Sequence, residues 1–222
     1  MVFHWSCMNS LGDTKEQVSN VLDSLRNINI NWDLVEEDLI EVLPYLLPSL
    51  AAAVILFILI FGVWLFVKKK PLPFPFLLFF FLWNGAMMGY ISLLCREPGS
   101  RDSVDLTFFA FLERGQWAIA FALENILFFI PFGILTTWML KKSSRRFCFL
   151  KSTISGFAVS VLIETTQMVT KRGFVQAEDV MLNTAGTMIG SLMIILIYAV
   201  LHMINIFLGF LRQKKLLCQK KW

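Results

Sequence analysis

Five long apolar runs constrain this chain more than any other feature of its sequence. They lie near residues 46–67, 73–95, 117–139, 149–170 and 182–208 of the 222-residue chain. A helix needs about 20 apolar residues to cross the hydrocarbon core of a bilayer. The hydrophobic share of 57% also exceeds the ~45–50% of ordinary soluble domains. The sequence therefore predicts an all-α, polytopic helical membrane bundle of about five transmembrane helices.

Basic residues gather at alternate ends of these runs. Thirteen of the twenty Lys and Arg residues lie at 68–70, 141–151 and 212–221, and none of the sixteen acidic residues does. Because Lys and Arg in short loops favour the cytoplasm, we expect a multi-pass protein of the cell membrane with its N-terminus outside and its C-terminus cytoplasmic. We interpret the basic clusters as topology signals and contacts for membrane lipids, so no nucleic acid is expected as a partner.

Polar residues inside the last three runs carry most of the functional information, because charged groups in lipid are costly and usually face a bundle interior or serve function. Glu164 and Gln167 share one helix face with Gly156 and Ser160. Asp179 and Asn183 begin a similar stripe in the last run. The cluster predicted near the outer surface comprises Asn125, Glu164, Gln167, Arg172, Asp179 and Asn183, with Glu124, Glu178, Arg101 and Asp105 as secondary candidates.

Proline and glycine residues are expected to shape these helices. Pro131 removes one backbone hydrogen bond and precedes Gly133, which predicts a kink in the third run. Gly186 and Gly190 lie on the stripe of the last run and predict close helix contact there. In the second run, a patch of small residues that includes Gly85 is likewise interpreted as packing scaffold.

The polar cluster has two interpretations at this point. In the structural one, the groups satisfy each other, with Arg172 neutralising a carboxylate while Gln167 and Asn183 bridge helices. In the functional one, paired carboxylates in an outward-facing cavity bind a cation, a headgroup amine or a hydroxyl. No metal site or cofactor is expected, because the four cysteines are scattered and the two histidines lie far apart.

Three motifs together resemble the VanZ-like family of membrane proteins. They are Glu-Asn-Ile-Leu-Phe-Phe-Ile-Pro-Phe-Gly at 124–133, Glu-Thr-Thr-Gln at 164–167, and Lys-Arg-Gly-Phe-Val-Gln-Ala-Glu-Asp-Val-Met-Leu-Asn-Thr-Ala-Gly at 171–186. The segment from Arg101 to Phe109 is similar to that family's outer segment. One departure is Gln176, which stands where the family usually has an Asp, with Glu178 as the nearby substitute.

The resemblance covers about residues 75–207 and implies a division of the chain. We expect an extracellular or interfacial amphipathic segment at 1–45 and an additional transmembrane helix at 46–70, entered at Pro44 and Pro48. A VanZ-like transmembrane domain at 71–208 and a basic cytoplasmic tail at 209–222 would follow. The role of residues 1–70 stays open.

The resemblance also implies a function, because founding members of the family are associated with resistance to teicoplanin-type glycopeptide antibiotics in Gram-positive bacteria, without an established enzymatic reaction. The first hypothesis is a non-enzymatic protein that alters access of a glycopeptide antibiotic or a lipid to the outer leaflet. The second is an intramembrane enzyme that modifies a lipid headgroup or a lipid-linked cell-wall precursor, with Glu164 or Asp179 as general acid or base. A small ion or solute carrier is the third, and the oligomeric state is open.

Overall fold

The computed structural model describes residues 30–70, 74–94, 104–112, 114–143, 147–172 and 175–219. Among them, five helices are long and apolar enough to cross a membrane. The prediction of an all-α, multi-pass membrane protein is therefore confirmed. These helices are α2 (Trp32–Lys68), α3 (Pro75–Gly89, prolonged by the π-helix η1, Tyr90–Leu94), α4 (Gln116–Ser143), α5 (Cys148–Thr170) and α6 (Ala177–Gln219).

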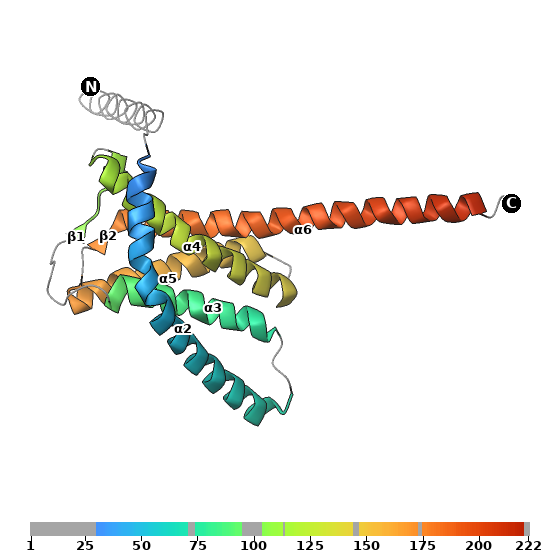
Figure 1. Ribbon diagram of the computed structural model, residues 1–222, viewed down its shortest axis with the longest axis horizontal. Coiled ribbons are helices and arrows are strands. Elements are labelled where there is room, and N and C mark those ends of the chain that lie inside the picture. Colours follow the sequence, from blue (N-terminus) through green and yellow to red (C-terminus); the bar gives the residue numbers. More distant parts are fainter. Residues whose placement is uncertain are drawn as a thin grey trace, which may run out of the picture.

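Helices α4, α5 and α6 form the centre of the molecule, and α4 contacts α6 more extensively than any other pair of elements among the described residues. Figure 1 shows α4, α5 and α3 side by side, with α6 running along α4. The core between α3, α4 and α5 is formed by Met88, Phe129, Phe132 and Ile163. Because lipid tails are as apolar as these side chains, close packing and polar contacts must hold the helices together.

One end of this bundle carries a pair of short strands and a short 3-10 helix. The two-residue strands β1 (Val104–Asp105) and β2 (Val175–Gln176) pair in parallel, and the 3-10 helix η2 (Ala110–Leu112) precedes α4. We call this the strand end, and the opposite end, where α2 finishes and α5 begins, the basic end. The sequence did not predict the strand pair, which ties the segment before α4 to the turn before α6.

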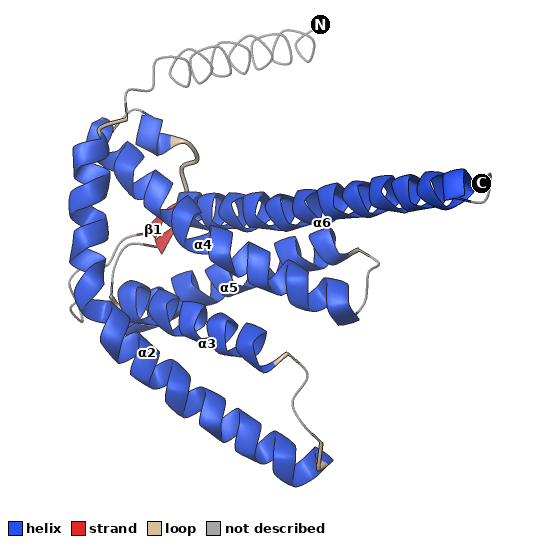
Figure 2. Cartoon of the chain, turned by 45° about the vertical axis from the view of Figure 1, so that its right-hand side comes forward, coloured by secondary structure: helices blue, strands red, loops and turns tan. Residues whose placement is uncertain are grey.

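Helix α2 is longer than its apolar run and begins at Trp32, where the Asn31 side chain accepts a hydrogen bond from the Asp33 N–H. Pro44 and Pro48 lie inside the helix instead of marking its start. Figures 1 and 2 show that α2 changes direction partway, its first part running steeply across the strand end. Interior prolines are a common cause of such bends. The boundary predicted at residue 45 thus falls within one helix, and residues 1–29 of the predicted amphipathic segment lie outside the described residues.

Helix α6 also exceeds its predicted run, since it starts at Ala177 and continues to Gln219. Its second half extends away from the other helices, as Figure 2 shows. Side chains 201–210 are all exposed. Close to the basic end, the Lys141 ammonium lies 3.9 Å from the centre of the Tyr198 ring, a cation–π contact that joins α4 to α6. The predicted tail from residue 209 is therefore helical to Gln219.

Candidate functional site at the strand end

The first contact at the strand end joins α4 to the first turn of α6. Asn125 Nδ2 donates a hydrogen bond to Asp179 Oδ1 at 2.9 Å. A carboxylate in the first turn of a helix is favoured by the partial positive charge of the free N–H groups there. The sequence placed both residues in one cluster, and the structure brings them into direct contact.

Two buried carboxylates hold the backbone of the loops. Glu164 Oε2 accepts a hydrogen bond from the Gln176 N–H at 2.9 Å, and Glu178 Oε1 accepts one from the Phe111 N–H at 3.0 Å. The two glutamates are only 5% and 6% exposed. Burying a charge is costly unless it is hydrogen-bonded, and bonds to a charged acceptor are stronger than neutral ones. Glu164 and Glu178 therefore fix β2 and η2 over the ends of the helices.

The end of α5 is tied to the π-helix η1. Gln167 Nε2 donates to the Ser92 carbonyl and Arg172 Nη1 donates to the Leu93 carbonyl, each at 2.9 Å. Carbonyls at a helix C-terminus lack partners within the helix and need outside donors. Arg172 thus binds a backbone carbonyl, and its role is to hold η1 against α5.

Asn183 lies one helical turn deeper than Asp179. Its Nδ2 donates to Ser160 Oγ at 2.9 Å, which joins α6 to α5. The Asn183 carbonyl in turn accepts a hydrogen bond from Thr187 Oγ1 at 3.1 Å. The structure therefore divides the predicted cluster into three kinds of contact. Asn125 bonds to Asp179, and Asn183 bonds to Ser160. The other three members bond to loop or helix-end backbone, namely Glu164, Gln167 and Arg172.

A second buried polar cluster lies deeper in the bundle and was missed by the sequence analysis. Ser152 Oγ is 2.6 Å from Thr136 Oγ1 and accepts a bond from Ser191 Oγ at 2.9 Å. Thr137 Oγ1 donates to Ser191 Oγ at 2.9 Å. These four side chains come from α4, α5 and α6. The sequence pattern that could have revealed this cluster is a spacing of four residues. Ser152 lies on the same face of α5 as Gly156 and Ser160. Ser191 lies on the same stripe of α6 as Asn183 and Thr187.

The predicted packing glycines lie where helix backbones meet. A Cβ atom on Gly133 would collide with the backbone of Thr187, one on Gly186 with that of Ile126, and one on Gly190 with that of Ile130. Gly156 is equally constrained by the Thr187 side chain. Helix α4 continues through Pro131, which is exposed.

Asp105 is the last residue of β1, at the start of the segment that leads to α4, and stands apart from the buried carboxylates. Its side chain accepts hydrogen bonds from the Thr107 hydroxyl, at 2.6 Å, and from the Thr107 N–H, at 3.0 Å, and it pairs with Arg114. These contacts, the Thr107 hydroxyl above all, hold the pKa of Asp105 well below its usual range. The pKa of Arg114 is correspondingly raised by Asp105.

Among the remaining candidates, Arg101 lies outside the described residues. Glu124 is half-buried on α4, beside Asn125 in sequence. Within the part of the chain that the structure describes, no group of three or more His, Cys, Asp and Glu side chains could hold a metal ion. The chemical character of the strand-end site therefore comes from its hydrogen-bonding side chains.

Two acceptor oxygens at this site have no hydrogen-bond partner within the described part of the chain. Gln167 Oε1 and Asn183 Oδ1 are both buried, on side chains that are 2% and 5% exposed. The orientation of the Gln167 amide is set by the Ser92 carbonyl, which can only accept. A buried acceptor without a partner costs free energy, about 1–3 kcal/mol. Such a group favours a donor, such as a water molecule, a hydroxyl or an ammonium group.

These observations define the class of protein: a multi-pass helical membrane protein whose three central helices carry a hydrogen-bonded polar cluster at one end. The family model VanZ/LLP1 matches residues 50–198. The chain belongs to the VanZ/LLP1 family. The match includes most of the apolar part of α2, which the sequence motifs alone had placed outside the family core. No curated protein and no solved structure matches the chain significantly.

Proposed function

We propose that this VanZ/LLP1 protein acts at the outer face of the cytoplasmic membrane of a Gram-positive bacterium. There the strand end binds the polar part of a lipid or of a lipid-linked cell-wall precursor, and it thereby lowers susceptibility to teicoplanin-type glycopeptide antibiotics. The proposal includes the orientation expected from the basic clusters, with the strand end outside.

The observation that carries the proposal is the concentration of buried polar groups at the strand end. The carboxylates of Glu164 and Glu178 are committed to loop amides, so the loops are fixed in place. Gln167 and Asn183 keep acceptor oxygens that have no partner among the described residues. A rigid end with free acceptors suits a ligand that brings hydroxyl or amine donors, as lipid headgroups and cell-wall precursors do.

The cluster supports binding more directly than catalysis. Each of the two loop-holding glutamates already uses a carboxylate oxygen to accept a backbone N–H, and this contact gives it a structural role at the strand end. The enzyme hypothesis is nevertheless separable by experiment. An enzyme would leave a chemical change in the lipid or precursor, whereas a binding protein would not.

The test is expression in a susceptible Gram-positive host, with teicoplanin and vancomycin inhibition compared at matched membrane levels. We expect wild type to raise the inhibitory concentration of teicoplanin more than that of vancomycin. Gln167→Leu, which removes the free acceptor and the bond to Ser92, should abolish the increase. Thr166→Val is the matched control, because Thr166 precedes Gln167 on α5 and donates only within its own helix.

Two outcomes would contradict the proposal. If wild type leaves both inhibitory concentrations unchanged, this chain has no role in glycopeptide susceptibility. If mass spectrometry finds a lipid or precursor mass present only with wild type, and absent with both Glu164→Gln and Asp179→Asn, the enzyme hypothesis replaces the binding one. Labelling of single cysteines placed near residues 175 and 144 from outside the cell tests the orientation separately.

A further inference from the structure

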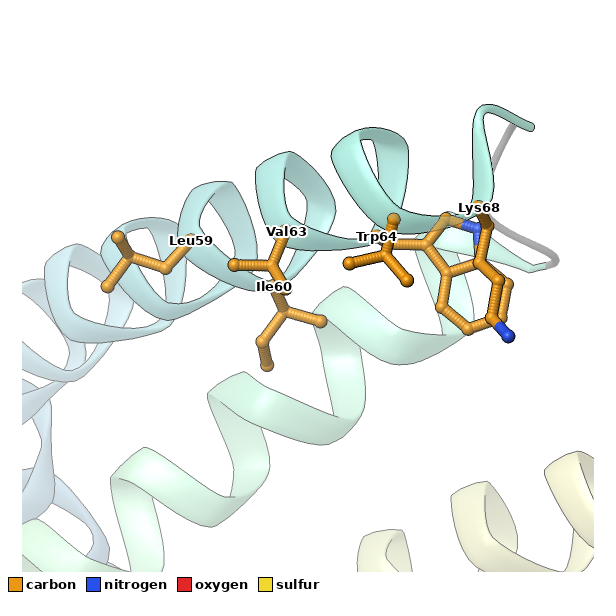
Figure 3. Close-up of a pocket in the computed structure, with 6 residues that line it drawn as sticks. Leu59, Ile60, Val63, Trp64 and Lys68 are labelled. Carbon is orange, nitrogen blue, oxygen red and sulfur yellow. The ribbon is translucent and has the colours of Figure 1, made fainter.

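A second candidate site lies far from the strand end, on the C-terminal part of α2. An open groove of about 370 Å³ is lined there by Leu59, Ile60, Val63, Trp64, Val67 and Lys68. Figure 3 shows their side chains along one stretch of the helix, with the α3 ribbon behind. All but the last are apolar, so the groove suits a hydrocarbon chain.

The groove occurs where the α2–α3 hairpin opens. The two helices contact each other through Trp83, which donates to Ser49 Oγ at 3.2 Å, and through the rings of Phe57 and Phe79. Beyond these contacts α2 and α3 diverge toward the basic end (Figures 1 and 2). Helix α3 begins only at Pro75. The stretch of α2 that lines the groove is therefore left with its apolar side chains uncovered.

The length of the groove corresponds to one leaflet of a bilayer. From Leu59 to Lys68 the helix rises by about 14 Å, at 1.5 Å per residue. Half of a hydrocarbon core of about 30 Å is about 15 Å. An acyl chain that starts at the level of Lys68 would thus run along the whole groove and end near the middle of the membrane.

The end of the groove at Lys68 is positively charged and lies beside the Trp64 ring. Lys68, Lys69 and Lys70 are consecutive and exposed. The Trp64 Nε1 atom is buried and has no hydrogen-bond partner among the described residues. Tryptophan at headgroup level commonly places its ring in the apolar region and its N–H toward polar lipid groups. Basic residues beside a membrane attract anionic lipids.

We propose that this groove binds an anionic phospholipid of the leaflet at the basic end. One acyl chain lies along Leu59, Ile60 and Val63, and the phosphate lies against the lysines that follow. The site is independent of the function proposed for the strand end, because it uses other residues at the opposite end of the helices.

Fluorescence quenching of Trp64 by brominated lipids tests the site. The full chain is reconstituted in phosphatidylcholine nanodiscs that contain either brominated phosphatidylglycerol or brominated phosphatidylcholine. The Trp64 signal is the difference between wild type and Trp64→Phe, since the chain contains seven tryptophans. We expect phosphatidylglycerol to quench this signal at several-fold lower content than phosphatidylcholine. Lys68→Gln should weaken that preference about fivefold, and Lys151→Gln, at an exposed lysine of α5, should not.

A substitution that fills the groove gives a second readout that does not depend on charge. Val63→Phe places a ring in the groove and should reduce quenching of Trp64 by both lipids. Ile58→Phe is its matched control, because Ile58 and Val63 are 62% and 63% exposed on the same helix but Ile58 does not line the groove. Equal quenching by the two brominated lipids would overturn the proposal, since the groove would then be ordinary lipid boundary. Absence of quenching by either would also overturn it, since another protein surface would cover the groove.

Discussion

The three-helix bundle of α4, α5 and α6 and the hairpin of α2 and α3 are both apolar enough to cross a membrane but are built differently. In the bundle, Gly133, Gly186 and Gly190 let helix backbones touch, and a Cβ at any of them would collide with a neighbouring backbone. In the hairpin, a Cβ on Gly62, Gly85 or Gly89 would meet no atom within 4 Å. Its helices are held instead by aromatic rings and by the hydrogen bond from Trp83 to Ser49. Among the described glycines, those at which helix backbones meet therefore all lie in the bundle.

Buried polar contacts follow the same division. The bundle carries the hydroxyl cluster of Ser152 and Ser191 and, at its strand end, the contacts of Asn125, Glu164 and Asn183. Hydrogen bonds between helices in lipid contribute on average about 0.6 kcal/mol each and up to about 1.7 kcal/mol. Several such bonds fix the register of the three helices. The hairpin is free to diverge and to expose a groove.

The largest effect is expected from a glycine of the bundle. Gly186→Ala should destabilise the protein by about 1–3 kcal/mol, because the new Cβ would displace the backbone of Ile126 and force α4 from α6. Gly85→Ala, in the hairpin, should be neutral or slightly stabilising, because alanine favours a helix and no atom obstructs it. Unfolding of the two purified variants in a denaturing-detergent titration measures both effects.

The same two variants can also show that the bundle and the hairpin do not differ in packing. Equal losses of stability would mean that the hairpin packs as tightly as the bundle, and no loss in Gly186→Ala would mean that α4 and α6 are not in backbone contact. From the sequence, we interpreted both glycine patches as packing sites. Only the neighbours of each glycine, which the sequence does not reveal, distinguish them.

A smaller effect is expected from the hydroxyl cluster. Ser152→Ala should cost about 1 kcal/mol, because it removes bonds that reach both α4 and α6. Ser155→Ala is the control on the same helix, since the Ser155 hydroxyl donates only to the Lys151 carbonyl one turn earlier. The titration used for the glycine variants applies. Equal stabilities of the two variants would show that the buried bonds add nothing beyond a bond within one helix.

The sequence predicted the helices and the cluster well where single patterns decide the outcome. Long apolar runs gave the number of spans, and spacings of three and four placed Glu164 and Gln167 on one face. The partners were less predictable, because they depend on atoms far apart in the chain. One of the two interpretations had Arg172 neutralise a carboxylate, whereas the structure shows it donating to the Leu93 carbonyl, 79 residues away in sequence. Backbone acceptors at the end of η1 carry no sequence signal.

Helix ends were also hard to predict. Pro44 and Pro48 suggested the entry to the first span, because proline interrupts backbone hydrogen bonding. The structure keeps both prolines inside α2 and bends the helix instead. The two-residue strand pair had no sequence signal of its own, although it positions Gln176 to donate to Glu164. It links two loops whose sequences are unrelated, and only their proximity reveals it.

The smallest effect is expected in the loop outside the bundle, where Asp105 contacts Thr107 and Arg114. The folded-state pKa of Asp105 is lowered, so its contribution to loop stability is present above the ordinary aspartate pKa of about 3.9 and is lost as the pH falls through the folded value. Because the Thr107 hydroxyl is the largest cause, Thr107→Val should raise the pKa of Asp105 more than Arg114→Gln does. Titration of the Asp105 carboxyl carbon by NMR in micelles measures both.

A larger rise of the Asp105 pKa in Arg114→Gln would mean that the ion pair, and not the hydroxyl, sets the charge of this loop. Neither substitution should change the stability of the α4–α5–α6 bundle, since the hydrogen bonds described above between its helices involve neither Thr107 nor Arg114.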